Sequence, residues 1–380
     1  MRSLDAARQI CEGYLPGLLD RLAEIPLDEL ESPDNPAIEI FRGHGGPGLV
    51  IPKTYAGAGA GPLDALAVTR ALGAAAPSLA VATTMHHFSV ATLFTLAESL
   101  QSSGAEWALL EGIAEQNLLV ASGFSEGRPG QGILSPNMQA TQTEGGYLIN
   151  GSKKPCSLSR SMDLLTASVS LPAADGTAEQ DMAVLLVPKD APGLTTHPFW
   201  GSFALAGAES EELRLEDVLI SEQQLMRTEK TDAGRMDALQ TVGFIWFELL
   251  ISASYLGMVS SLVERVVQRG RGSDSDRARL ICRLESATLL LEGMARMIVA
   301  GETGNESLAK TLVARYAAQD ALAACAGQAV ELLGGMAFVG SSDVAYLAAA
   351  SHGLSFHPPS RASFTEPFLD HMAGRPLKIV

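Results

Sequence analysis

The chain has 380 residues, of which 47% are hydrophobic, so it is long enough to bury a large core in two or three domains. Its formal net charge of −16 argues against nucleic acid or an anionic membrane as the main partner, because both require a basic surface. The 4 cysteines lie far apart without CxxC spacing, which predicts neither a zinc site nor a disulfide framework and fits a reducing cytoplasm.

The first part of the chain is predicted to be mainly helical. Apolar residues spaced three and four apart predict a helix over about 3–25, and acidic residues among them argue against a secretion signal. A Gly-rich loop over 45–59 leads into a helix over Pro62–Ala75, and a further apolar helix contains 83–88. The apolar run 71–82 is interrupted by Pro77, and no run is long enough to predict a membrane span.

The segment 118–168 has the hydrophobic pattern of β-strands, and its Gly and Pro residues mark the turns between them. It predicts strands over Met138–Gln142 and Tyr147–Asn150, with a hairpin-grade turn at Asn150-Gly151. Two further strands, Met182–Pro188 and Ser210–Ile220, complete a mostly antiparallel β unit.

The remainder of the chain is predicted to form long helices over Gln240–Arg269, Asp274–Val299 and Ser307–Leu333. With a shorter segment over Ser342–Ala350 they make an antiparallel bundle of about four helices. The predicted fold class is therefore α+β, with a β unit between two helical blocks.

Two motifs of the β unit resemble the middle domain of the acyl-CoA dehydrogenase superfamily. One is Phe124-Ser125-Glu126 before a Gly-rich turn, and the other is Gly146–Lys153, which has the form G-x-x-x-N-G-x-K. The loop 45–59 and the strand 212–218 are similar to two further signatures of that superfamily.

The resemblance implies the superfamily's architecture and partners. It implies an N-terminal α-helical domain over 1–118, a middle β-sheet domain over 119–228 and a C-terminal four-helix bundle over 229–380. It also implies FAD as cofactor, an acyl-CoA or acyl-carrier-protein substrate, and electron-transfer flavoprotein or oxygen as electron acceptor. Because the superfamily shares its cofactor site between subunits, a homodimer or homotetramer is expected.

Cofactor contacts follow from the same resemblance. In the superfamily both β motifs hydrogen-bond the flavin ring, and a helix end with a glycine turn from a neighbouring subunit approaches the pyrophosphate. The matching positions here are Phe124, Ser125, Gly130, Cys156, Ser157, Arg269, Arg271, Glu331, Gly334, Gly335 and Ser360. Glu331 replaces a Gln, and its charge would repel a pyrophosphate unless it were turned away. The pair Gly334-Gly335 is equally typical of a helix C-cap. The loop that contains Arg269 and Arg271 is equally typical of a solvated turn between helices.

The catalytic glutamate of many members is missing, because Pro358 stands at its position. Glu248 is one candidate to replace it, since a carboxylate within the apolar run 244–251 is costly to bury without a function or a partner such as an Arg or Ser. His357 is the second candidate, because imidazole is a competent base near neutral pH.

The implied substrate pocket contains Met85, His86, His87 and Gln131. Adjacent histidines on a helix cannot both face one side, so at most one of them is expected to touch a ligand. A histidine in such a helix is more often a hydrogen-bonded core residue.

Three functions remain open. The first is flavin-dependent α,β-dehydrogenation of an acyl thioester, with Glu248 or His357 as base. The second is a flavin-dependent monooxygenase of the same fold, which the lost glutamate and the three histidines His86, His87 and His357 favour. The third is a non-catalytic scaffold, against which the retained Ser125 and Ser157 argue.

Overall fold

The computed structural model describes residues 1–98, 104–128, 135–172, 180–228 and 236–379. The first helical block comprises α1 (Arg2–Tyr14), α2 (Leu18–Ala23), α3 (Leu27–Leu30), α4 (Ala37–Gly43), α5 (Pro62–Ala75), α6 (Pro77–Glu98) and α7 (Ala105–Gln116). The single helix predicted over 3–25 is two helices, because Pro16 disfavours helical backbone at Leu15 and Gly17 adopts a φ of 76°.

The middle block is one eight-stranded mixed sheet. Its strands are β1 (Val120–Gly123), β2 (Gln139–Thr143), β3 (Gly146–Cys156), β4 (Leu164–Pro172), β5 (Gln180–Pro188), β6 (Leu194–His197), β7 (Glu211–Ile220) and β8 (Leu225–Arg227). The order is β6-β7-β3-β2-β4-β5-β8, and β1 pairs with β4. The pairings β1–β4 and β2–β4 are parallel, and the other described pairings are antiparallel, as the sequence mostly predicts.

The hairpin turn predicted at Asn150-Gly151 is wrong, because β3 continues through it. The register against β7 shifts between Ile149 and Gly151, which marks a β-bulge. The Asn150 side chain donates to Asp217 Oδ1 at 3.0 Å and accepts from the Asp217 amide at 2.9 Å. Gly151 has a φ of 148°, so it tolerates the bend. The Asn-Gly pair bends a long strand instead of ending it.

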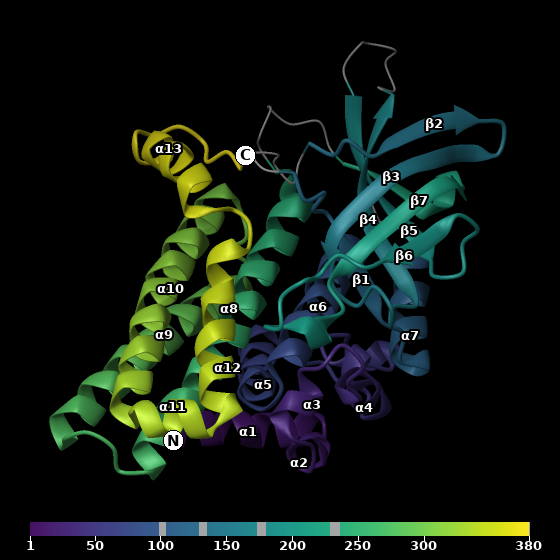
Figure 1. Cartoon of the computed structure of the whole chain (residues 1–380). Coiled ribbons are helices and arrows are strands. Elements are labelled where there is room, and N and C mark those ends of the chain that lie inside the picture. The colour runs from purple at the N-terminus through teal and green to yellow at the C-terminus, as the bar shows by residue number, and fades with distance from the viewer. Residues whose placement is uncertain (99–103, 129–134, 173–179, 229–235, 380) are drawn as a thin grey trace.

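The second helical block comprises α8 (Ala238–Gln268), α9 (Asp274–Val299), α10 (Asn305–Leu333), α11 (Gly335–Gly340), α12 (Ser342–Ala350) and α13 (Arg361–Met372). The helix α8 packs against α5, α6, α9 and α10. Figure 1 shows the sheet and the pair α9 and α10 on opposite sides of the molecule, with α6 and α8 between them. In chain order the β-sheet domain lies between two helical blocks, as the sequence predicts.

Two helices, α6 and α8, are long and apolar enough to cross a membrane by length and composition, although no such span is predicted above. The most apolar window of α8 is 100% buried inside the structure, and that of α6 is 67% buried. Buried core helices pass the same test, so these two helices form the centre of the fold.

Candidate active site

A cavity of about 1950 Å³ lies between the sheet and the helices α6 and α8. Typical ligand sites have about 300–1,000 Å³, so this one has room for a cofactor and a substrate together. Its wall on the β side includes Phe124, Ser125, Pro155, Ser157 and Trp200. Its helical wall includes Met85, Phe88, Ser89, Thr92, Phe244 and Phe247, and Tyr255 and His357 border one end.

The helical wall is built by helix periodicity. Phe244, Phe247 and Tyr255 recur on one face of α8, and Phe88 of α6 packs edge-on against Phe247 with ring centroids 5.4 Å apart. The sequence predictions above do not include this aromatic face. The spacing of its rings along a helix is the signal that would have found it.

Hydroxyl groups line the wall on the β side. The Ser157 and Ser210 hydroxyls are 3.0 Å apart, and each keeps capacity for another hydrogen bond. The Ser125 backbone carbonyl accepts a hydrogen bond from the Lys154 amide at 2.9 Å, and this bond joins the two predicted flavin motifs. The structure thus brings Phe124, Ser125 and Ser157 to one wall of the cavity.

A buried ion pair supports that wall. Lys153 Nζ lies 2.8 Å from Glu126 Oε1 and donates to the Ser168 hydroxyl at 3.0 Å. Glu126 also accepts the backbone amides of Asn137 and Met138, both at 3.0 Å. A carboxylate with this many partners holds the β motif in place, which gives Glu126 a structural role.

His357 borders the cavity just after the short helix η5 (Ser351–Phe356). Its Nε2 is 2.9 Å from the Tyr255 hydroxyl. Burial lowers the pKa of His357 to about 3, with a further lowering by the Arg315 guanidinium, so the imidazole is neutral at physiological pH. Arg315 Nη2 donates to the carbonyls of His357 at 3.0 Å and Leu354 at 2.8 Å, and so positions this segment.

Glu248 lies behind this end of the cavity. Its side chain is 0% exposed and is not part of the cavity lining. Arg315 Nε is 3.4 Å away, and neither carboxylate oxygen has a hydrogen-bond partner among the described residues. Burial raises the pKa of Glu248 to about 8 although Arg315 lowers it. This geometry matches a structural carboxylate beside an Arg and gives Glu248 no access to a substrate.

Neither His86 nor His87 lines the cavity, contrary to the expectation for this pocket. His86 Nδ1 accepts the Val120 amide at 3.0 Å, so Nε2 carries the proton and donates to the Pro47 carbonyl at 2.9 Å. His87 is 1% exposed and its ring nitrogens have no partner among the described residues. Burial lowers the pKa of both rings, so they are neutral core residues, whereas Met85 does line the cavity.

Two other predicted cofactor residues, Cys156 and Ser360, lie away from the cavity. Cys156 is 0% exposed, and its thiol is directed to the Ser122 carbonyl at 3.5 Å. Ser360 caps α13 by accepting the Ser363 amide at 3.1 Å. Gly130 and Gln131 lie outside the described residues.

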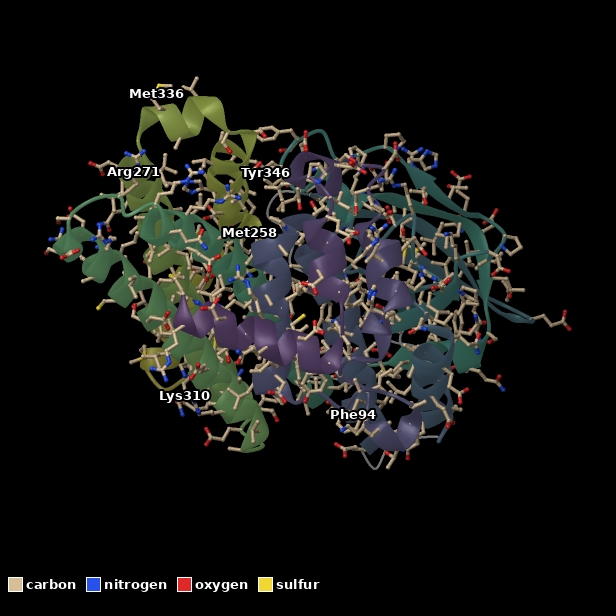
Figure 2. All side chains as sticks on the ribbon, turned by 90° about the horizontal axis from the view of Figure 1, so that it is seen from below. Phe94, Met258, Arg271, Lys310, Met336 and Tyr346 are labelled. Carbon is tan, nitrogen blue, oxygen red and sulfur yellow. The ribbon has the colours of Figure 1, made fainter. Side chains whose placement is uncertain are left out.

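The remaining predicted residues lie on the surface around the α8–α9 loop and the end of α10: Arg269, Arg271, Glu331, Gly334 and Gly335. Figure 2 places Arg271 and Met336 at the same end of the molecule. Gly334 ends α10 with a φ of 83° and a ψ of 163°, which is not the left-handed helical conformation of a glycine C-cap but one that glycine adopts readily. Within one chain these residues do not reach the cavity.

Comparison with known proteins gives one family match and a relative of full length. Residues 121–218 match the family described as acyl-CoA dehydrogenase, middle domain. Isobutylamine N-hydroxylase of Streptomyces viridifaciens is 51% identical over 380 residues, which is 100% of both chains. Dibenzothiophene monooxygenase of Rhodococcus erythropolis is 26% identical over 189 residues, 50% of this chain and 44% of that protein.

A solved structure has the same fold over nearly the whole chain. KijD3, solved in complex with FMN and a dTDP-amino sugar, superposes with a TM-score of 0.82 at 18% identity, covering 97% of this chain and 93% of that one.

Proposed function

The chain belongs to the acyl-CoA dehydrogenase superfamily, and we propose that within it this protein is a flavin-dependent monooxygenase that hydroxylates the nitrogen of a small aliphatic amine. The full-length relative named isobutylamine N-hydroxylase supports the reaction type. The observation that carries the proposal is the position of Glu248, which is sealed behind the cavity beside Arg315. An α,β-dehydrogenase needs a base within hydrogen-bond reach of the substrate. Glu248 lies outside the cavity lining, and burial lowers the pKa of His357 to about 3, which makes its imidazole a weak base.

The wall on the β side fits a flavin ring. Phe124, Pro155 and Trp200 offer apolar faces, while Ser125 and Ser157 offer hydrogen bonds to the polar edge of a ring. These residues would hold the isoalloxazine against the sheet and leave the helical wall for the substrate. A reduced flavin held there would supply one oxygen atom from dioxygen to a nucleophile.

We propose FMN as the flavin, where the superfamily resemblance implies FAD. The resemblance implies that the pyrophosphate of FAD would lie at the Gly334-Gly335 turn of a neighbouring subunit, where the exposed Glu331 carboxylate would repel it. KijD3, of the same fold, was solved with FMN. Separate titrations of the protein with FMN and FAD, followed by flavin fluorescence, test this choice. Tighter binding of FAD would contradict it.

The overall reaction consumes the amine, dioxygen and reduced flavin, and releases the hydroxylamine, water and oxidised flavin. The aromatic pair Phe88 and Phe247 excludes water from the reacting groups. The hydrogen-bonded pair Tyr255 and His357, both uncharged, relays the proton that the amine nitrogen loses toward the second oxygen atom, which leaves as water. Arg315 holds the His357 backbone and so fixes the position of this pair.

The test combines the purified protein with FMN, NADH, a separate flavin reductase and isobutylamine in air. The expected result is the hydroxylamine, detected by mass spectrometry, with no product when either the protein or the reductase is omitted. A protein that instead bleaches oxidised flavin anaerobically on addition of an acyl thioester would be a dehydrogenase. A protein that does neither would be the scaffold considered above.

We also propose that the chain associates with further copies of itself through α11. Met336 is 84% exposed and Val339 is 82% exposed, and both follow the Gly334-Gly335 turn (Figure 2 labels Met336). A neighbouring apolar surface would cover these side chains. Light scattering on the purified protein tests this, and a monomer at micromolar concentration would contradict it.

A further inference from the structure

We propose that the cavity binds its amine as the uncharged free base, and therefore selects monoamines with an apolar carbon chain over amino acids and diamines. The inference rests on the proposed function and names the substrate class of the same site. It follows from the positive charge of Arg315 behind the wall and from the lack of an acid among the described residues of the helical wall.

The wall that would contact the substrate carries no acid among its described residues. Between α6 and the His357 end it consists of aromatic, apolar and hydroxyl side chains, namely Met85, Phe88, Ser89, Thr92, Phe244, Phe247 and Tyr255. Two of the hydroxyls already serve the helix backbone, Ser89 donating to the Met85 carbonyl at 2.9 Å and Thr92 to the Phe88 carbonyl at 2.7 Å. An ammonium placed here would lose its hydration and find no counterion.

The titratable and charged groups of the described lining are Glu106 on α7, Glu222 and Arg227 near β8, Asp237 and Tyr255 on α8, and His357 after η5. Arg315 and Glu248 lie behind the wall at His357.

Two acids of this set, Asp237 and Glu222, are already engaged by other groups. Asp237 begins α8 and accepts the Gln240 amide at 2.7 Å. It precedes Phe247 by ten residues, which is about 15 Å along a helix, and Tyr255 by eighteen, about 27 Å. Glu222 pairs with Arg227 at 3.5 Å. Neither Asp237 nor Glu222 is therefore placed to neutralise an ammonium beside Phe247.

At pH 7 the full charge behind the His357 end is positive, because burial raises the pKa of the neighbouring Glu248 carboxyl to about 8. Arg315 donates to the His357 carbonyl and helps to lower the pKa of the imidazole, so the ring stays neutral. The same field disfavours protonation of any amine placed beside that ring.

Attraction of an ammonium to the aromatic rings does not reverse this preference. A cation over an aromatic ring in a dry site gains less free energy than an ion loses when it is removed from water. The free base has no such cost, and its nitrogen lone pair is the nucleophile that N-hydroxylation requires.

Calorimetric titration of the full-length protein with isobutylamine between pH 6 and 9 tests the inference. A primary alkylamine titrates near the lysine value of about 10.4, so its free-base fraction rises about tenfold per pH unit over this range. The expected apparent Kd for total amine therefore falls about tenfold per pH unit. The uncharged isostere 2-methylpropan-1-ol is the control, and its Kd is expected to change less than about twofold, because it does not titrate.

A Kd for isobutylamine that does not depend on pH, or that tightens as the pH falls, would overturn the inference, as would an absence of binding throughout the range. At pH 9, valine and 1,4-diaminobutane are expected to bind at least about tenfold more weakly than isobutylamine, because each brings a further charge into the cavity. Equal binding of the three amines would also overturn it.

A matched pair of variants places the effect in the cavity. Ser89→Asp adds a carboxylate to the helical wall, and Ser89→Asn adds a neutral group of the same shape. The Asp variant is expected to reduce the change in Kd to less than about threefold per pH unit, because it supplies the missing counterion, while the Asn variant keeps the steep dependence. The same steep dependence in both variants would show that the amine binds elsewhere and would overturn the inference.

Failure of the inference and failure of the proposed function give different results. Hydroxylamine formation with pH-independent amine binding would remove the inference and keep the function. Steep pH-dependent binding without hydroxylamine formation would support the charge preference and remove the reaction.

Discussion

Replacing Glu248 by Gln is expected to remove a pH-dependent loss of stability while leaving N-hydroxylation in place. The carboxyl group is 0% exposed and its pKa is raised from 4.5 to about 8. Below the pKa of the unfolded chain, the group is protonated in both states. As the pH rises, the unfolded chain loses this proton before the folded protein does, so unfolding becomes easier until the pH passes the folded pKa.

The magnitude follows from the same values. Each pH unit between the two pKa values corresponds to about 1.4 kcal/mol, so this one group costs the wild type about 4 kcal/mol of stability between pH 5 and 8. Gln does not titrate and keeps the shape of the side chain. The stability of Glu248→Gln relative to the wild type should therefore rise by about 4 kcal/mol over that range.

Urea unfolding followed by circular dichroism at pH 5, 6, 7 and 8 measures this difference. The matched control is Glu264→Gln on the same helix, where a hydrogen bond from Arg8 lowers the pKa of the carboxyl. That carboxylate stabilises the fold above its unfolded pKa and loses the contribution only as the pH falls through its folded pKa. The control variant should therefore be less stable by an amount that changes little between pH 5 and 8.

Two results would refute the reasoning. An equal pH dependence in Glu248→Gln and the wild type would mean that the buried carboxyl is ionised across the range. Loss of hydroxylamine formation in a variant that folds and binds flavin normally would make Glu248 part of the reaction after all.

Three further variants test the cavity. Tyr255→Phe removes the 2.9 Å hydrogen bond to His357 and should lower kcat about two- to tenfold with the flavin Kd unchanged; an unchanged kcat would remove Tyr255 from proton transfer. Gly353→Ala would put a Cβ 2.5 Å from the Tyr255 oxygen, so we expect a similar fall in kcat and a loss of about 1–3 kcal/mol in urea unfolding, and wild-type behaviour in both would contradict the packing. Ser157→Ala should weaken flavin binding about two- to tenfold in a fluorescence titration, and an unaltered Kd would place the flavin away from this wall.

The sequence predicts the bounds of a helix closely where the helix begins with a capping residue or a proline. The predicted bounds of α9 match the structure, because Ser273 caps the helix by accepting the Asp276 amide at 3.2 Å. The helix α5 likewise begins at Pro62, whose ring suits the first position of a helix. The Asn150-Gly151 turn fails because the same dipeptide also suits a bulge, and only pairing with Asp217 in β7 distinguishes the two.

The site is less predictable because its contacts join distant parts of the chain. His86 is held by the Pro47 carbonyl and the Val120 amide, neither of which belongs to its own helix. Glu248 pairs with Arg315 on α10, and His357 is hydrogen-bonded to Tyr255 on α8. Motifs do place Ser125 and Ser157 on one wall, since both lie in short segments with a characteristic local pattern.

The most direct test of the N-hydroxylation proposal is a single turnover with labelled oxygen. Protein with chemically reduced FMN and isobutylamine is mixed with ¹⁸O₂ at a pH near 8, and the products are analysed by mass spectrometry. The proposed function predicts an N-hydroxylamine that carries one ¹⁸O atom. Unchanged amine, together with anaerobic bleaching of the oxidised flavin by an acyl thioester, would contradict it.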